Sequence, residues 1–185
     1  PAYALVEALS ALDAAAYDYV LLDCPGGHVG MGQMALMAAD EVIIPTGLSV
    51  VDLYAAVPTL SQIRDAQDFR ADGGRPTLLG FLPNGAGKAG VPAKLQALLD
   101  EHGLPSFTPV RASALLKTVA LAAQLQRRCL VLSRPDCPAS VSYRQVAREI
   151  DLGLDVVRAE LANAQAGADE AESGAGPAAD LLAAE

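Results

Sequence analysis

The stretch from residue 17 to residue 27, YDYVLLDCPGG, decides the fold class. It is a short apolar run that ends in Asp23 and breaks into a Pro-Gly-Gly turn, which predicts a buried strand over 19–22 followed by a loop. Further apolar runs predict strands over 41–45 and 77–82. None of these runs alternates polar and apolar residues, as expected when helices cover both faces of a parallel sheet.

Helical patterns separate the apolar runs. Ser49 and Asp52 form a capping-box pattern that opens a helix expected to end near residue 69. A short fourth strand is expected over 106–110, and the remaining helices are expected over 33–39, from Pro92 to Gly103, over 113–128 and over 138–161. This alternation predicts an α/β fold, in which a parallel sheet is flanked by helices.

Composition places most of the chain in one ordered domain. Hydrophobic residues make up 52% of the 185 residues, which excludes a wholly disordered chain. We expect an ordered domain over 1–161 and a disordered acidic tail over 162–185, where Ala, Gly, Glu and Asp dominate. No apolar run reaches the roughly 18 residues of a membrane span, and the three cysteines form no CxxC pair, so we expect a cytoplasmic protein without a membrane anchor.

The formal net charge of −9 conceals a basic block. Between residues 111 and 148 there is one acidic residue against seven basic ones: Arg111, Lys117, Arg127, Arg128, Arg134, Arg144 and Arg148. Basic side chains on helices most often form a solvated face. The alternative is contact with nucleic-acid phosphates, which positions a protein without reading base sequence.

Asp23 is the candidate metal-side residue. An aspartate at the carboxyl end of a buried parallel strand lies where open α/β sheets bind ligands. In phosphate-handling enzymes such a carboxylate holds Mg²⁺, and glycines after it allow backbone N–H groups to approach a phosphate. The alternative is that Asp23 only starts a turn before Pro25 and Gly26.

Three segments together resemble the ParA/MinD/Soj-type partition ATPases. They are residues 17–27, ADEVIIPTGLSVVDLYAAVPTLSQI at 39–63 and PASVSYRQVAREI at 138–150, and the resemblance covers about residues 5–150. It implies a P-loop NTPase-like fold that binds ATP and Mg²⁺. The resemblance also implies a homodimer, a ParB-like partner protein, and association with the nucleoid through non-specific DNA binding in chromosome or plasmid partitioning.

The resemblance also assigns roles to particular residues. Asp23 is similar to the Walker B carboxylate on the magnesium side, and the loop of Pro25, Gly26 and Gly27 is similar to the segment that senses the γ-phosphate. Asn84 and Pro109 are similar to adenine-side positions, although Asn84 can also be a simple turn residue. The implied DNA-binding residues are Arg111, Lys117, Arg128, Arg144 and Arg148.

The chain departs from the family at the phosphate-binding loop. No Lys-Gly-Gly-x-x-Lys-Ser/Thr loop precedes Tyr17, and the one lookalike, residues 85–89, has the wrong glycine spacing and no Ser or Thr for magnesium. We therefore expect an N-terminally truncated family domain that does not hydrolyse ATP by itself. The alternatives are a catalytically inactive interaction module that regulates relatives, and a metabolic ATPase of the same superfold.

The resemblance also predicts a gap in the sheet. In this superfold the P-loop strand lies between the two strands that correspond here to 19–22 and 42–44. Without it, both strands would expose unpaired N–H and C=O groups. We expect a marginally folded chain that self-associates through these edges, rather than direct pairing of the two strands or filling of the gap by another protein.

Overall fold

The computed structural model describes residues 3–13, 16–25, 29–71, 73–112, 130–154, 156 and 159. The predicted helix over 113–128 and the predicted tail over 162–185 lie outside these residues. So do four of the candidate site residues, which are Gly26, Gly27, Lys117 and Arg128.

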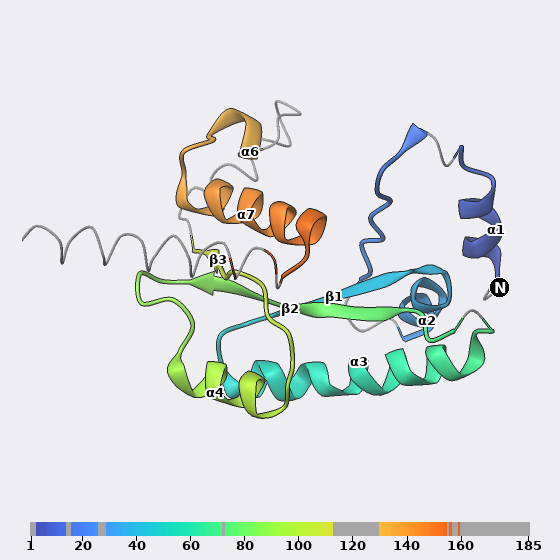
Figure 1. Ribbon diagram of the computed structural model, residues 1–185, viewed down its shortest axis with the longest axis horizontal. Helices are drawn as coiled ribbons and strands as arrows, with labels where there is room; N and C mark the ends of the chain where they lie inside the picture. The colour runs from blue at the N-terminus through green and yellow to red at the C-terminus, as the bar shows by residue number, and fades with distance from the viewer. Residues whose placement is uncertain are drawn as a thin grey trace, which may run out of the picture.

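The described elements form a parallel sheet with helices on both faces (Figure 1). In chain order they are α1 (Ala4–Ser10), α2 (Val29–Ala38), β1 (Glu41–Thr46), α3 (Val50–Phe69), β2 (Thr77–Ala86), α4 (Ala93–Glu101), β3 (Val110–Arg111), α6 (Leu130–Ser133) and α7 (Pro138–Leu152). The sheet order is β1-β2-β3 and both pairs are parallel. The predicted fold class is therefore confirmed.

Two hydrophobic clusters lie on the two faces of the sheet. The larger one packs α2, α3 and α4 against β1 and β2, and contains Leu36, Ile44, Leu53, Ala56, Ile63, Ala66, Phe81, Leu95 and Leu99. The smaller one packs α7 on the opposite face, around Phe107, Val110 and Val146. Ile43 and Ile44 contact different clusters because successive strand residues point to opposite faces.

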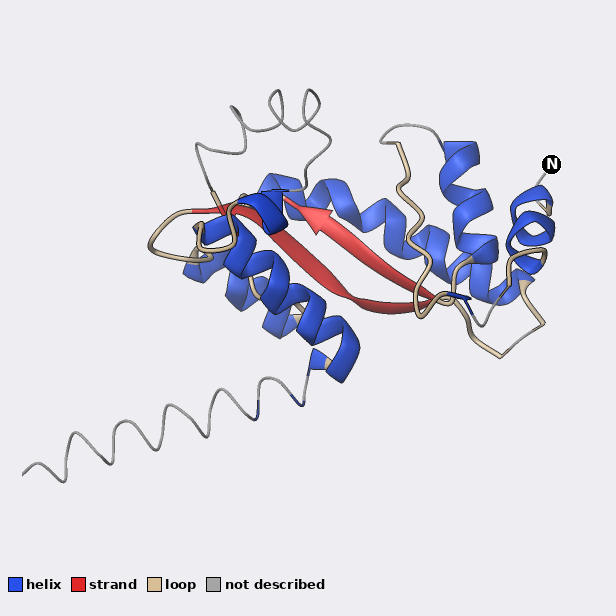
Figure 2. Ribbon diagram, turned by 90° about the horizontal axis from the view of Figure 1, so that it is seen from above, coloured by secondary structure: helices blue, strands red, loops and turns tan. Residues whose placement is uncertain are grey.

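A bulge in β2 changes which of its residues face each hydrophobic cluster. Val42 pairs with Leu78 and Ile43 with Gly80, so Leu79 is an extra residue in β2 (Figure 2 shows β1 and β2 side by side). After this insertion Phe81 faces the larger cluster, although Leu79, two residues earlier, faces the smaller one. Glycine is required at the bulge because a Cβ on Gly80 would lie 2.9 Å from the carbonyl oxygen of Pro105.

The N-terminus of α3 confirms the predicted capping box. The Ser49 hydroxyl accepts a hydrogen bond from the Asp52 N–H at 3.1 Å, and the Asp52 carboxylate accepts one from the Ser49 N–H at 3.0 Å. The Ser49 hydroxyl also donates to the Asp52 carboxylate at 2.6 Å, and this bond, together with the one from the Ser49 N–H, lowers the pKa of Asp52. The helix starts and ends where the sequence predicts, because its boundaries are set by local backbone partners.

Three predicted boundaries differ from the structure. The fourth strand, expected over 106–110, is confined to Val110–Arg111, with an isolated bridge between Phe81 and Ser106 before it. The strand expected to end at residue 82 continues to Ala86, because residues 84 and 86 pair with β3. The last helix, expected to reach about residue 161, is interrupted at Gly153, which adopts a positive φ of 88°: α7 ends at Leu152, and residues 154, 156 and 159 are again helical.

The predicted strand over 19–22 is also wrong. Residues 17–25 form no strand, and Tyr19 and Leu21 are 55% and 86% exposed. The contact that this segment makes is a hydrogen bond of 3.0 Å from the Tyr19 hydroxyl to the Asp151 carboxylate of α7, which raises the pKa of Tyr19. A strand requires a ladder partner, and in the described residues β1 pairs with β2 alone.

Hydrogen exchange tests this open edge. We expect amides 19–22 to exchange almost without protection and amides 42–44 to be less protected than those of β2. Protection of 42–44 should increase with protein concentration if the edge self-associates, because each dry, unpaired backbone group costs about 1–3 kcal/mol. Strong protection over 19–22 and 42–44 in a monomer with a cooperative melt would contradict both the open edge and marginal folding.

Candidate functional site

The predicted magnesium side does not form a metal site in the described residues. Asp23, Cys24 and Pro25 are exposed on the segment that is not a strand, so Asp23 does not lie at the carboxyl end of a strand as predicted. No three His, Cys, Asp or Glu side chains of the described ranges are grouped to hold a metal ion. One exposed carboxylate does not fit a bound Mg²⁺–ATP, so we derive no catalytic step through it.

The carboxyl end of β1 carries an unsatisfied polar group. Thr46 is buried, and its hydroxyl has no hydrogen-bond partner among the described residues. Buried hydroxyl groups in proteins normally have a partner. The described fold therefore leaves one polar position unsatisfied at the sheet edge where parallel α/β proteins bind ligands.

The two predicted adenine-side residues are placed differently. Asn84 is not in a turn: it lies within β2, opposite Val110, and its side-chain amide donates to the Leu82 carbonyl oxygen at 3.1 Å. Pro109 immediately precedes β3 and lines a pocket. The structure thus brings Pro109, but not Asn84, to a cavity.

We call this cavity the β3 pocket. It has a volume of about 390 Å³ and lies between the Gly87–Gly90 turn, the segment 108–111 and the first half of α7. Its lining residues are Ala86, Gly87, Lys88, Gly90, Thr108, Pro109, Arg111, Val141, Ser142 and Gln145. Its size and its place at the carboxyl ends of β2 and β3 are typical of small-molecule sites in α/β folds.

Two polar links fix α7 to the wall of the β3 pocket. The carboxylate of Glu149, which is 4% exposed, accepts hydrogen bonds from the Thr108 N–H at 2.9 Å and from the Thr108 hydroxyl. The Ser142 hydroxyl accepts from the Arg111 N–H at 3.3 Å and donates to the Pro138 carbonyl oxygen at 2.9 Å. The segment that carries Pro109 is therefore held at both of its ends.

Sequence reasoning missed Glu149 and Lys88. Glu149 follows Ser142 and Val146 at a spacing of four and three residues, so it lies on the buried face of α7. An acidic residue at a core position of an amphipathic helix was the available signal. Lys88 was considered only as part of a P-loop lookalike, and nothing in the sequence indicates that this exposed lysine lines the same pocket as Arg111.

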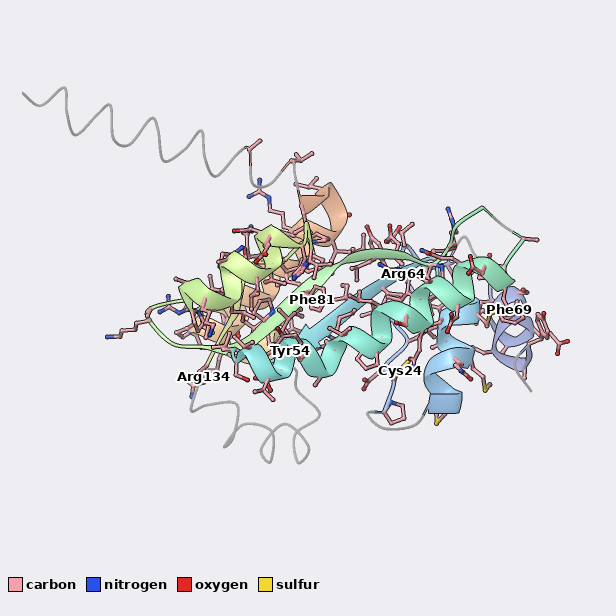
Figure 3. All side chains as sticks on the ribbon, turned by 90° about the horizontal axis from the view of Figure 1, so that it is seen from below. Cys24, Tyr54, Arg64, Phe69, Phe81 and Arg134 are labelled. Atoms are coloured by element: carbon pink, nitrogen blue, oxygen red, sulfur yellow. The ribbon has the colours of Figure 1, made fainter. Side chains whose placement is uncertain are left out.

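Three residues of the predicted basic patch are described in the structure: Arg111, Arg144 and Arg148. Arg144 and Arg148 lie one turn apart on the exposed face of α7, and Arg144 donates to the Pro135 carbonyl oxygen at 2.7 Å. Arg134, labelled in Figure 3, is exposed in the turn that leads to this helix. The Arg111 backbone N–H donates to Ser142 on the packed side of α7, and the Arg111 side chain is exposed.

Comparison with known proteins agrees with the fold. Residues 1–71 match the model of a family described as an AAA domain. Among solved structures, apo McdA of Cyanthece is similar, with a TM-score of 0.59 and 22% identity over 80% of this chain. The aligned part spans 57% of the McdA chain. No curated protein matches the chain.

The parallel sheet, its flanking helices and the shared architecture with McdA define a P-loop NTPase-like α/β fold. The match of residues 1–71 to an AAA domain family and the fold shared with McdA agree with the fold that the sequence resemblance predicts. We find no described helix whose length and hydrophobicity would allow it to span a bilayer.

Proposed function

We propose that this chain is part of a ParA-type partition protein that contacts DNA through the exposed face of α7. One observation carries this proposal: Arg144 and Arg148 lie side by side on the face of α7 that points away from the sheet. Guanidinium groups bind phosphate oxygens with two parallel hydrogen bonds, and contacts of this kind do not depend on base sequence.

The remaining properties are proposed for the intact protein, on the basis of the resemblance. It would bind ATP and Mg²⁺, dimerise, respond to a ParB-like partner and associate with the nucleoid in the cytoplasm during chromosome or plasmid partitioning. Because the sequence printed here contains no P-loop, we expect this chain alone to show no ATP hydrolysis and weak or no ATP affinity.

The double substitution Arg144→Glu with Arg148→Glu tests DNA contact. We expect the chain to retard random-sequence duplex DNA weakly and with a steep dependence on salt, because binding releases counterions from the phosphates. The double variant should lose this retardation, since two attractive charges become repulsive. The measurement is gel retardation or fluorescence anisotropy at several salt concentrations.

A matched double variant separates this surface from net charge. Arg64 on α3, labelled in Figure 3, and Lys94 on α4 are exposed, so Arg64→Glu with Lys94→Glu changes the charge by the same amount elsewhere. It should retain most of the DNA binding. Equal losses in both double variants, with thermal melts like that of the unaltered chain, would remove the α7 face from the proposal.

The second candidate function is a catalytically inactive ParA-like module that pairs with relatives. It is favoured by the open edge of β1 and by the lack of a magnesium site in the described residues. Calorimetry tests the expectation that both candidates share, because Mg-ATP binding of micromolar strength to this chain would contradict it and would require another loop to supply the phosphate contacts.

A further inference from the structure

The β3 pocket combines features that together point to an anionic ligand. Its lining contains two cations, Lys88 and Arg111, and no Asp or Glu. The whole chain carries a net charge of −9, so the charge that lines this cavity is opposite in sign to the charge of the chain. Neither cation has an acidic partner among the described residues.

We infer that the β3 pocket binds a phosphate group, which Lys88 and Arg111 hold from its two walls. Lys88 lies in the turn between Gly87 and Gly90, which is closed by a hydrogen bond of 3.2 Å from the Gly90 N–H to the Gly87 carbonyl oxygen. Arg111 is fixed from the other side, because its N–H donates to Ser142 of α7. Hydrogen bonds therefore hold the backbone at both charged residues.

The rest of the lining suits the same ligand. The Thr108 and Ser142 hydroxyls and the Gln145 amide add polar groups to the two cations. Glu149, the buried acid of α7, does not line the pocket, and its oxygens accept hydrogen bonds from Thr108 and Gln145. A phosphate would thus meet two charges and the second N–H of the Gln145 amide without facing an unpaired carboxylate, since the Thr108 and Ser142 hydroxyls donate to Glu149 and to the Pro138 carbonyl oxygen.

The phosphate can come from free phosphate or from the backbone of DNA, and the two sources are distinguishable. The DNA source rests on the proposed function, and the free anion does not. Lys88 lines the β3 pocket beside α7, whereas Arg144 and Arg148 lie on the exposed face of this helix. A DNA strand that contacts all three residues would run past the end of the sheet and around α7.

The experiment uses Lys88→Glu and the matched control Lys94→Glu, which changes the charge equally at an exposed lysine of α4. Each chain is titrated with inorganic phosphate while the amide resonances of Gly90 and Arg111 are followed by NMR. Binding of random duplex DNA is measured in parallel over a range of salt concentrations.

We expect phosphate to shift the Gly90 and Arg111 resonances in the unaltered chain and in Lys94→Glu, but not in Lys88→Glu. If DNA supplies the phosphate, Lys88→Glu should also weaken DNA binding about tenfold and reduce its salt slope by about one, whereas Lys94→Glu should not. A loss of phosphate shifts alone assigns the pocket to a free anion, and a loss of DNA binding alone assigns it to DNA.

Equal behaviour of Lys88→Glu and Lys94→Glu with both ligands would overturn the inference. That result leaves the proposed function standing if the Arg144 and Arg148 double variant still loses DNA binding. Conversely, failure of the unaltered chain to bind DNA ends the proposed function, while the phosphate titration still decides the pocket. A far-ultraviolet circular dichroism melt of each variant shows that it is folded.

Discussion

Phe81→Ala is expected to destabilise the fold by about 3–5 kcal/mol, because Phe81 is fully buried in the larger cluster and its removal leaves a cavity. The typical stability of a domain is only about 5–15 kcal/mol, and we expect this chain to lie at the low end of that range, because β1 pairs on one side only in the described residues. We therefore expect loss of a cooperative melt, measured by circular dichroism or by urea titration.

The chain supplies a matched control for this substitution. Phe69, at the end of α3, is 82% exposed (Figure 3 labels both phenylalanines), so Phe69→Ala removes the same atoms from a solvated position. It should change the free energy of unfolding by less than about 0.5 kcal/mol. Similar melts for the two variants would mean that the sheet does not pack on α3 and α4 as described.

Glu149→Ala is expected to have the second-largest effect. It removes the buried acceptor of the Thr108 N–H and hydroxyl, and a buried donor left without a partner costs about 1–3 kcal/mol. Because these bonds connect α7 to the segment before β3, the loss should appear as weaker amide protection at Thr108 and Arg111. Hydrogen exchange and the urea midpoint both measure it.

Two further variants give this prediction its specificity. Glu149→Gln keeps the shape and one acceptor oxygen, so its loss of stability should lie between those of the unaltered chain and Glu149→Ala. Glu101→Ala removes an exposed carboxylate at the end of α4 and should be nearly neutral. A Glu149→Ala variant as stable as Glu101→Ala would show that α7 is held by apolar contacts alone.

Much of the fold could be predicted because its signals are local. The apolar runs at 41–45 and 77–82 became the cores of β1 and β2, and the Ser49–Asp52 pair set the start of α3. The same type of signal failed at 19–22, which has the composition of a buried strand and remains an exposed segment. Composition shows that a segment suits a strand, but pairing depends on a neighbour elsewhere in the chain.

The candidate site was predictable only in part. Pro109 and the arginines were assigned from the resemblance; Pro109 lines a cavity, and its adenine-side role and the DNA-binding role of the arginines stay predictions. The position of Asn84 was mistaken because β2 is extended by pairing with β3, which no local pattern shows. Arg111 was grouped with Arg144 and Arg148, and no sequence pattern shows that its backbone N–H bonds to Ser142 of α7.

The sequence by itself therefore determined the parallel α/β class, the two long strands, the capped helix α3 and the basic character of residues 111–148. These depend on hydrophobic period, turn residues and caps, all of which act within a few positions of the chain. Only the tertiary structure decided that residues 17–25 stay outside the sheet, that Glu149 is buried against Thr108, and that Lys88 and Arg111 share a pocket. The physical reason is that strand pairing, burial and the clustering of like charges involve residues far apart in the chain. All three therefore depend on which surfaces of the molecule pack together.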